Sequence, residues 1–145
     1  RLDGRGYMLS SSSGKAIEIL SKNPKGFFLM IEGSQIDWAA HKSSTDTTVN
    51  ETLDFDKAIG VALDFAQNDG HTLVIVTADH ETGGVTITGG SKENHQVNLS
   101  FSTKGHTAVM VPVYAYGPGA KNFRGIYDNT DGFKKILKAF GFGNQ

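Results

Sequence analysis

A run of four aliphatic residues at 73–76 constrains the fold more than any other part of this sequence. It carries no polar side-chain atom, which is typical of a strand buried on both faces of a sheet. Similar apolar runs lie at residues 26–33 and 109–116. Amphipathic helices are predicted at residues 15–22 and 54–68 and around residues 133–140. Apolar strands that alternate with such helices predict a three-layer α/β/α fold with a mostly parallel central sheet.

The domain limits follow from local composition. The serines at 10–13 and Gly14 indicate that residues 1–14 form a linker or an irregular N-terminal segment. Residues 15–145 then form one domain, and 145 residues are enough for a hydrophobic core. Residues 85–105 alternate in polarity on both sides of a glycine-rich turn, so we expect an antiparallel excursion from the sheet there.

Composition excludes several classes of protein. There is no apolar run of 18 residues, so no membrane-spanning helix is predicted. The net charge is -1 and no basic run occurs, which argues against nucleic-acid or anionic-membrane partners. The opening RLDGRGYM shows no signal peptide. Without cysteine, any metal ion would be held by His, Asp, Glu or neutral oxygen atoms.

Acidic residues end two of the predicted strands. Glu32 closes the first strand, and Asp79 with His80 follows the second directly. Ligands of open α/β sheets bind beyond the carboxyl ends of the strands. If the two strands are parallel neighbours, these side chains meet at one edge of the sheet.

Three further residues extend this set. Asp37 and His41 are four residues apart, which places both on one face of a helical turn. His106 immediately precedes the third strand, so it reaches the same edge only if its loop folds back or the strand runs in the opposite direction. One Asp with two His is a familiar zinc set. Glu32, an oxygen ligand, suits a hard ion such as magnesium.

Each residue also has a purely structural interpretation. Glu32 is also compatible with a helix cap or an ion pair, and Asp37 with an N-cap of its own helical turn. His41 is compatible with a solvated surface position. Asp79 and His80 would be satisfied by a hydrogen bond to each other. The residue spacing leaves these alternatives open.

Three long motifs, in the same order, resemble a known family. The segments GFFLMIEGSQIDWAAH, LVIVTADHETGG and GHTAVMVPVYAYGPGA are similar to the metal-binding half of the alkaline phosphatases. The resemblance runs from about residue 16 to residue 140 and implies a partial alkaline-phosphatase-like fold. It also implies two zinc ions and one magnesium ion. By position, the implied ligands are Glu32 for magnesium, Asp37, His41 and His106 for the first zinc, and Asp79 and His80 for the second zinc.

The implied activity is hydrolysis of small phosphate monoesters through a phosphoserine intermediate. The nucleophilic serine, a phosphate-binding arginine and some metal ligands of the family have no match in this sequence. We therefore expect a C-terminal portion of a longer enzyme, with no catalytic residue of its own and no activity in isolation. The family resemblance further implies a homodimeric parent in the periplasm or outside the cell.

Two alternatives remain open at the level of sequence. One is a related phosphodiesterase, sulfatase or phosphomutase, since these enzymes use the same fold and metal set. The other is a non-catalytic metal-binding or interaction domain.

Overall fold

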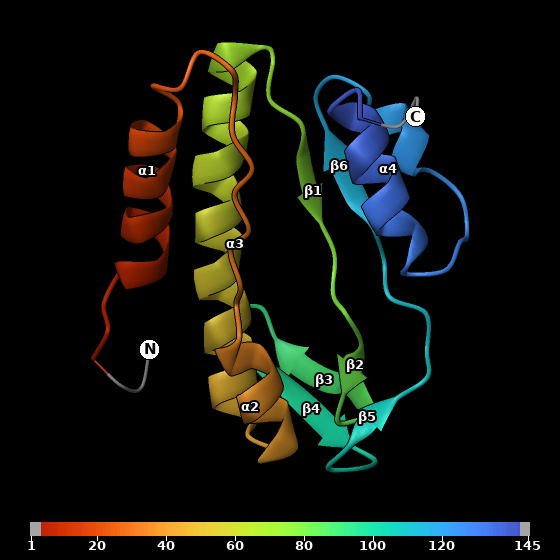
Figure 1. Ribbon diagram of the computed structural model, residues 1–145. Coiled ribbons are helices and arrows are strands. Elements are labelled where there is room, and N and C mark those ends of the chain that lie inside the picture. Colours follow the sequence, from red (N-terminus) through yellow and green to blue (C-terminus); the bar gives the residue numbers. More distant parts are fainter. Residues whose placement is uncertain (1–3, 143–145) are drawn as a thin grey trace. The chain divides into compact units, whose positions relative to one another are not determined.

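The computed structural model describes residues 4–142 and divides the chain into two compact units. The first comprises the chain up to Ala62 together with His80–Met110. The second comprises Leu63–Asp79 together with the chain from Val111 onward. Figure 1 shows the order of the elements along the chain. Helix α3 begins in the first unit and ends in the second.

The elements of the first unit are α1 (Met8–Leu20), α2 (Gln35–His41), most of α3 (Thr45–Asp69), β2 (Glu81–Thr82), β3 (Val85–Ser91), β4 (Gln96–Phe101) and β5 (His106–Thr107). The second unit holds the end of α3, β1 (Val74–Val76), β6 (Tyr114–Tyr116), the 3₁₀ helix η1 (Ala120–Phe123) and α4 (Asp131–Ala139).

Helix α1 corrects the prediction of an irregular segment at residues 1–14. The helix already begins at Met8, and residues 1–3 lie outside the described part. The Ser13 hydroxyl is buried and donates to the Leu9 carbonyl at 2.7 Å, which is how a serine is accommodated within a helix. A Cβ added at Gly14 would lie 3.5 Å from Val61, where α1 runs beside α3 (Figure 1). Serine and glycine therefore serve helix packing here, not flexibility.

Helix α3 is longer than the predicted helix at residues 54–68. Asp54, the predicted N-cap, lies within the helix and is only 3% exposed. Thr48 and Glu51 are also buried. The first half of the helix thus buries polar side chains at a spacing of three residues, so it lacks the apolar period that marks a helix. Gly70, with φ at 72°, ends the helix as predicted.

The described strands form three two-stranded sheets, and every pair is antiparallel. For the predicted central strands this is a correction, since Val74 pairs with Tyr116 and Val76 with Tyr114. Parallel pairing was predicted because the apolar runs alternate with amphipathic helices. An apolar run by itself carries no information on strand direction. The chain leading into β6 therefore starts from the end at which β1 finishes.

The predicted strand at residues 26–33 is extended chain without a ladder partner among the described residues. Phe28 and Met30 are 62% and 77% exposed. An apolar run becomes a strand only beside another strand. By contrast, β3 and β4 pair antiparallel as predicted for residues 85–105, with a register irregularity between Ile87 and Gly89.

Helix α2 is held by two small residues that face the interior. Ala39 and Ala40 are 2% and 3% exposed. With this side of the helix packed, Asp37 and His41 lie together on another part of its surface. The described helices are all too short or too polar to span a lipid bilayer.

Candidate metal centre

Three side chains of the first unit converge on one point. Asp37 and His41 come from α2, and His106 comes from β5. His41 Nε2 lies 3.3 Å from Asp37 Oδ2, and His106 Nε2 lies 3.4 Å from Asp37 Oδ1. The two Nε2 atoms are 3.2 Å apart. The structure thus brings together the three residues that the sequence predicts as one zinc site.

These separations match the coordination geometry of zinc. Zinc binds nitrogen and carboxylate oxygen at about 2.0–2.2 Å in tetrahedral sites, so neighbouring ligand atoms are roughly 3.3–3.5 Å apart. The two Nε2 atoms, 3.2 Å apart, lie close to that range, and each lies 3.3–3.4 Å from a different oxygen of Asp37. With one ligand atom from each residue, all three atoms lie within 4.8 Å of one another. One carboxylate with two imidazoles also has the donor chemistry of a zinc site with one open position.

The hydrogen bond on the far side of His41 determines its tautomer. Its Nδ1 lies 2.6 Å from the carbonyl oxygen of Lys104. A carbonyl only accepts, so Nδ1 carries the hydrogen and Nε2 of the neutral ring presents its lone pair to Asp37 and His106. Metal-binding histidines are commonly oriented in this way by a second partner.

A second histidine is oriented through a threonine. The Thr82 hydroxyl donates to Asp37 Oδ1 at 2.5 Å, and its oxygen lies 3.2 Å from His80 Nδ1. Because the single hydroxyl hydrogen goes to Asp37, His80 Nδ1 must be the donor in the other contact. Nε2 of His80 is then the nitrogen with the lone pair. The His80 ring also stacks on His106, with centroids 3.5 Å apart.

The β2–β5 ladder and the turn after β2 place His106. Thr82 pairs with His106 and Glu81 with Thr107. Gly83, with φ at 93°, accepts from the backbone N–H groups of residues 102 and 103 and donates to the carbonyl of residue 105 at 2.9 Å. The glycine therefore lets the backbone turn against residues 102–105.

Burial and hydrogen bonding have opposite effects on the pKa of Asp37. Burial raises its pKa, but the hydrogen bond from Thr82 and the attraction of His41, His106 and His80 lower it, and the pKa is below its ordinary value. Asp37 is therefore ionised at neutral pH, which is the state that binds a metal ion.

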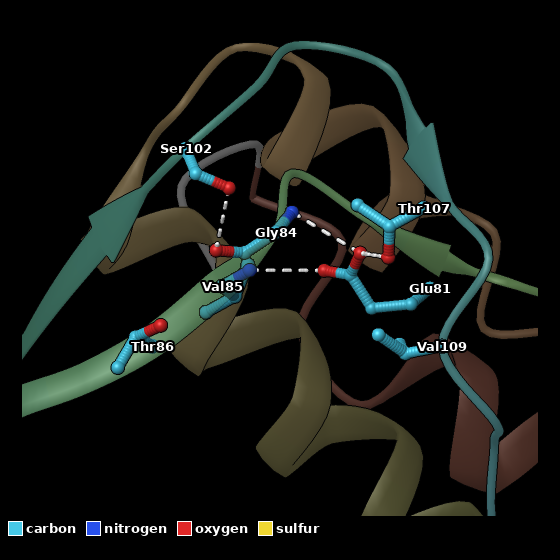
Figure 2. Close-up of a pocket in the computed structure, with 7 residues that line it drawn as sticks. All are labelled: Glu81, Gly84, Val85, Thr86, Ser102, Thr107 and Val109. Atoms are coloured by element: carbon cyan, nitrogen blue, oxygen red, sulfur yellow. Dashed lines mark hydrogen bonds between the residues drawn. The ribbon is translucent and has the colours of Figure 1, made fainter.

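Glu81 is a structural residue that sequence reasoning missed. Its carboxylate accepts from the backbone N–H groups of Gly84 at 3.1 Å and Val85 at 2.9 Å, and from the Thr107 hydroxyl (Figure 2). It lines a pocket of about 270 Å³. Burial raises its pKa, yet the hydrogen bonds from Thr107, Val85 and Gly84 prevail and the pKa is lowered. An acid two residues before a Gly-Gly pair was the available signal, because such a side chain can accept hydrogen bonds from the turn that follows.

The remaining predicted ligands lie outside the three-residue cluster. Glu32 is exposed and lies in the extended segment before α2. Asp79 belongs to the second unit, although His80 belongs to the first. The metal roles predicted for Glu32, Asp79 and His80 stay predictions.

Comparison with known proteins gives a consistent result. A family model described as alkaline phosphatase matches residues 7–95 and 90–142. Alkaline phosphatase 4 of Bacillus subtilis is 34% identical over 208 residues, covering 97% of this chain and 45% of that protein. The alkaline phosphatase of Escherichia coli K12 is 38% identical, covering 92% of this chain and 32% of its own length.

The solved alkaline phosphatase of the Antarctic bacterium TAB5 is 50% identical, with a TM-score of 0.89 over 98% of this chain and 43% of that one. A structure of a variant of the TAB5 enzyme has magnesium bound. The chain thus spans less than half the length of each of these relatives. The predicted α/β fold of alkaline-phosphatase type is confirmed as a partial fold. This chain belongs to the alkaline phosphatase family.

Proposed function

We propose that this chain is the metal-binding part of a phosphatase that hydrolyses phosphate monoesters, and that Asp37, His41 and His106 hold a zinc ion. The observation that carries the proposal is the convergence of one carboxylate and two imidazoles, with one ligand atom of each within 4.8 Å of the others and the two Nε2 atoms 3.2 Å apart. Membership of the alkaline phosphatase family supports the substrate class.

The donor set favours zinc over harder ions at this cluster. Magnesium and calcium take mainly oxygen ligands, whereas two of the three side chains here are imidazoles. The carboxylate is ionised, and the Lys104 carbonyl leaves Nε2 of His41 free of hydrogen in the neutral ring. Zinc bound in such a site acts as a Lewis acid toward phosphoryl oxygen.

The other ions of the proposal have weaker structural support. Asp79 and His80 would hold a second zinc, and Glu32 would bind magnesium. For His80, the support is the contact of its Nδ1 with the Thr82 hydroxyl at 3.2 Å, which orients the ring. For magnesium, the support is the structure of a TAB5 variant that binds this ion.

The reaction itself needs a nucleophile that we assign to no residue of this chain. We propose a phosphoserine intermediate whose serine lies outside this sequence. The residues described here would bind the metal ion and orient its ligands. The Lys104 carbonyl orients His41, and the Thr82 hydroxyl orients Asp37. A homodimeric and exported parent, implied by the family resemblance, stays a prediction.

The test uses the protein as its complete natural reading frame encodes it. Hydrolysis of p-nitrophenyl phosphate and zinc content are measured for wild type, His41→Ala and His106→Ala, with His95→Ala as the matched control in the β3–β4 turn. We expect the two site variants to lose both zinc and activity and the control to keep both. Equal activity after exhaustive chelation, or preference for a phosphate diester or a sulfate ester, would contradict the proposed function.

A further inference from the structure

The Glu81 carboxylate joins two segments that are far apart in the chain. Its Oε2 accepts from Gly84 N and from the Thr107 hydroxyl, and its Oε1 accepts from Val85 N. Figure 2 shows the side chain reaching between the turn that follows β2 and strand β5. The carboxylate thus uses both oxygens within the protein.

The need for such a link lies in the shortness of the ladder that carries His106. Strands β2 and β5 are two residues long and pair only as Glu81 with Thr107 and Thr82 with His106. Two-stranded pairings are marginal in water even when they are longer. A side-chain bond from Glu81 to Thr107 adds a second connection next to His106.

The same carboxylate holds the backbone turn that follows Thr82. Gly84 has φ at 56°, a conformation that favours glycine, and its N–H is directed to Glu81. The Ser102 hydroxyl donates to the Gly84 carbonyl at 3.3 Å. Glu81 therefore fixes the backbone on both sides of the Thr82–His106 pair.

We propose that Glu81 is a positioning residue for the metal centre: by tying the β2 turn to Thr107, it holds His106 and Thr82 where they meet Asp37. The proposal rests on the proposed function, because it assumes that Asp37, His41 and His106 bind a metal ion. The hydrogen bonds of Glu81 go to Gly84, Val85 and Thr107, so it acts on the metal centre through Thr107 and through the turn.

Glutamine is an informative replacement because it keeps the shape and cannot keep all the bonds. If the glutamine NH₂ group takes the place of Oε2, it faces the N–H of Gly84. If it takes the place of Oε1, it faces the N–H of Val85. In both orientations two donors oppose each other, so one backbone bond is lost. Thr107→Val removes the other end of the link while the Glu81 charge remains. Thr107→Ser keeps a hydroxyl and should restore the link.

The experiment titrates Co²⁺ into the metal-free protein, expressed from its complete natural reading frame, and records the visible absorption of tetrahedral Co²⁺. We expect Glu81→Gln and Thr107→Val each to raise the dissociation constant about ten-fold, the lower end for residues that orient metal ligands. Thr107→Ser should bind like wild type. Glu93→Gln and Thr88→Val, both in the β3–β4 hairpin, are the matched controls and should also bind like wild type.

The outcomes separate the two proposals. If wild type gives no tetrahedral Co²⁺ spectrum, the metal centre itself is refuted. If wild type binds but Glu81→Gln and Thr107→Val bind equally well, the positioning role of Glu81 is refuted. Far-UV circular dichroism at the titration temperature identifies variants that fail to fold. Should Glu81→Gln unfold, the Thr107→Val and Thr107→Ser pair decides, and Thr107→Ser binding as weakly as Thr107→Val would overturn the proposal.

Discussion

Replacing Thr82 by valine tests how much a single hydroxyl contributes to the metal centre. The substitution keeps the side-chain shape but removes the 2.5 Å bond to Asp37 Oδ1 and the acceptor 3.2 Å from His80 Nδ1. A hydrogen bond to a charged group contributes about 1.5–3 kcal/mol. The Asp37 side chain is 36% exposed, so we take the lower limit. About 1.4 kcal/mol is a ten-fold change in affinity, so zinc should bind roughly ten-fold more weakly.

The assay is competition for zinc between the protein and a chromophoric chelator of known affinity. Thr88→Val is the control, because it removes a hydroxyl that donates to the Asn98 carbonyl in the β3–β4 hairpin. We expect the control to keep the wild-type dissociation constant. A folded Thr82→Val protein whose zinc dissociation constant lies within two-fold of wild type would refute the reasoning about this hydroxyl.

Four further predictions concern stability. A Cβ at Gly117 would lie 2.2 Å from the Thr72 carbonyl oxygen at φ 101°, so Gly117→Ala should lower the free energy of unfolding by about 2 kcal/mol or more, measured by urea denaturation. Gly132→Ala, in α4 with open space at the Cβ, should instead be neutral or stabilising by up to about 1 kcal/mol. The hydrogen bond from Thr72, with further bonds from His71 and Thr72 backbone groups, lowers the pKa of Asp69 against the effect of burial. Its contribution is therefore fully present above the unfolded value of about 3.9 and lost as pH falls through the lowered folded pKa. Asp69→Asn should consequently be less stable than wild type at pH 6, and the two should converge in acid; a gap that persists at pH 2 would contradict this. Finally, chelation should lower the thermal midpoint, because free zinc at 100 times its dissociation constant stabilises by about 2.7 kcal/mol; an unchanged midpoint would count against metal binding by the folded protein.

The predicted zinc residues illustrate what a sequence can reveal. The spacing of Asp37 and His41 needs only one helical turn to bring them together, and α2 supplies that turn. The convergence of His106 depended on strand direction, which an apolar run does not encode. His106 lies in β5, and the antiparallel pairing of β5 with β2 places it opposite Thr82.

The missed features share one physical cause. The N-terminal half of α3 buries Thr48 and Glu51, and Glu81 is satisfied by its own turn and by Thr107. The burial of these polar side chains is set by tertiary packing, so hydrophobic periodicity does not report them. The extended segment at residues 26–33 shows the converse case, in which a strand-like pattern has no strand beside it among residues 4–142.

The most direct test of the central claim is a crystal structure of the zinc-loaded natural protein with anomalous diffraction recorded at the zinc edge. The account predicts an anomalous peak about 2.0–2.2 Å from an Asp37 carboxylate oxygen and from Nε2 of both His41 and His106. A zinc-loaded crystal with no peak within reach of these three atoms, and with the two histidine rings turned apart, would contradict it.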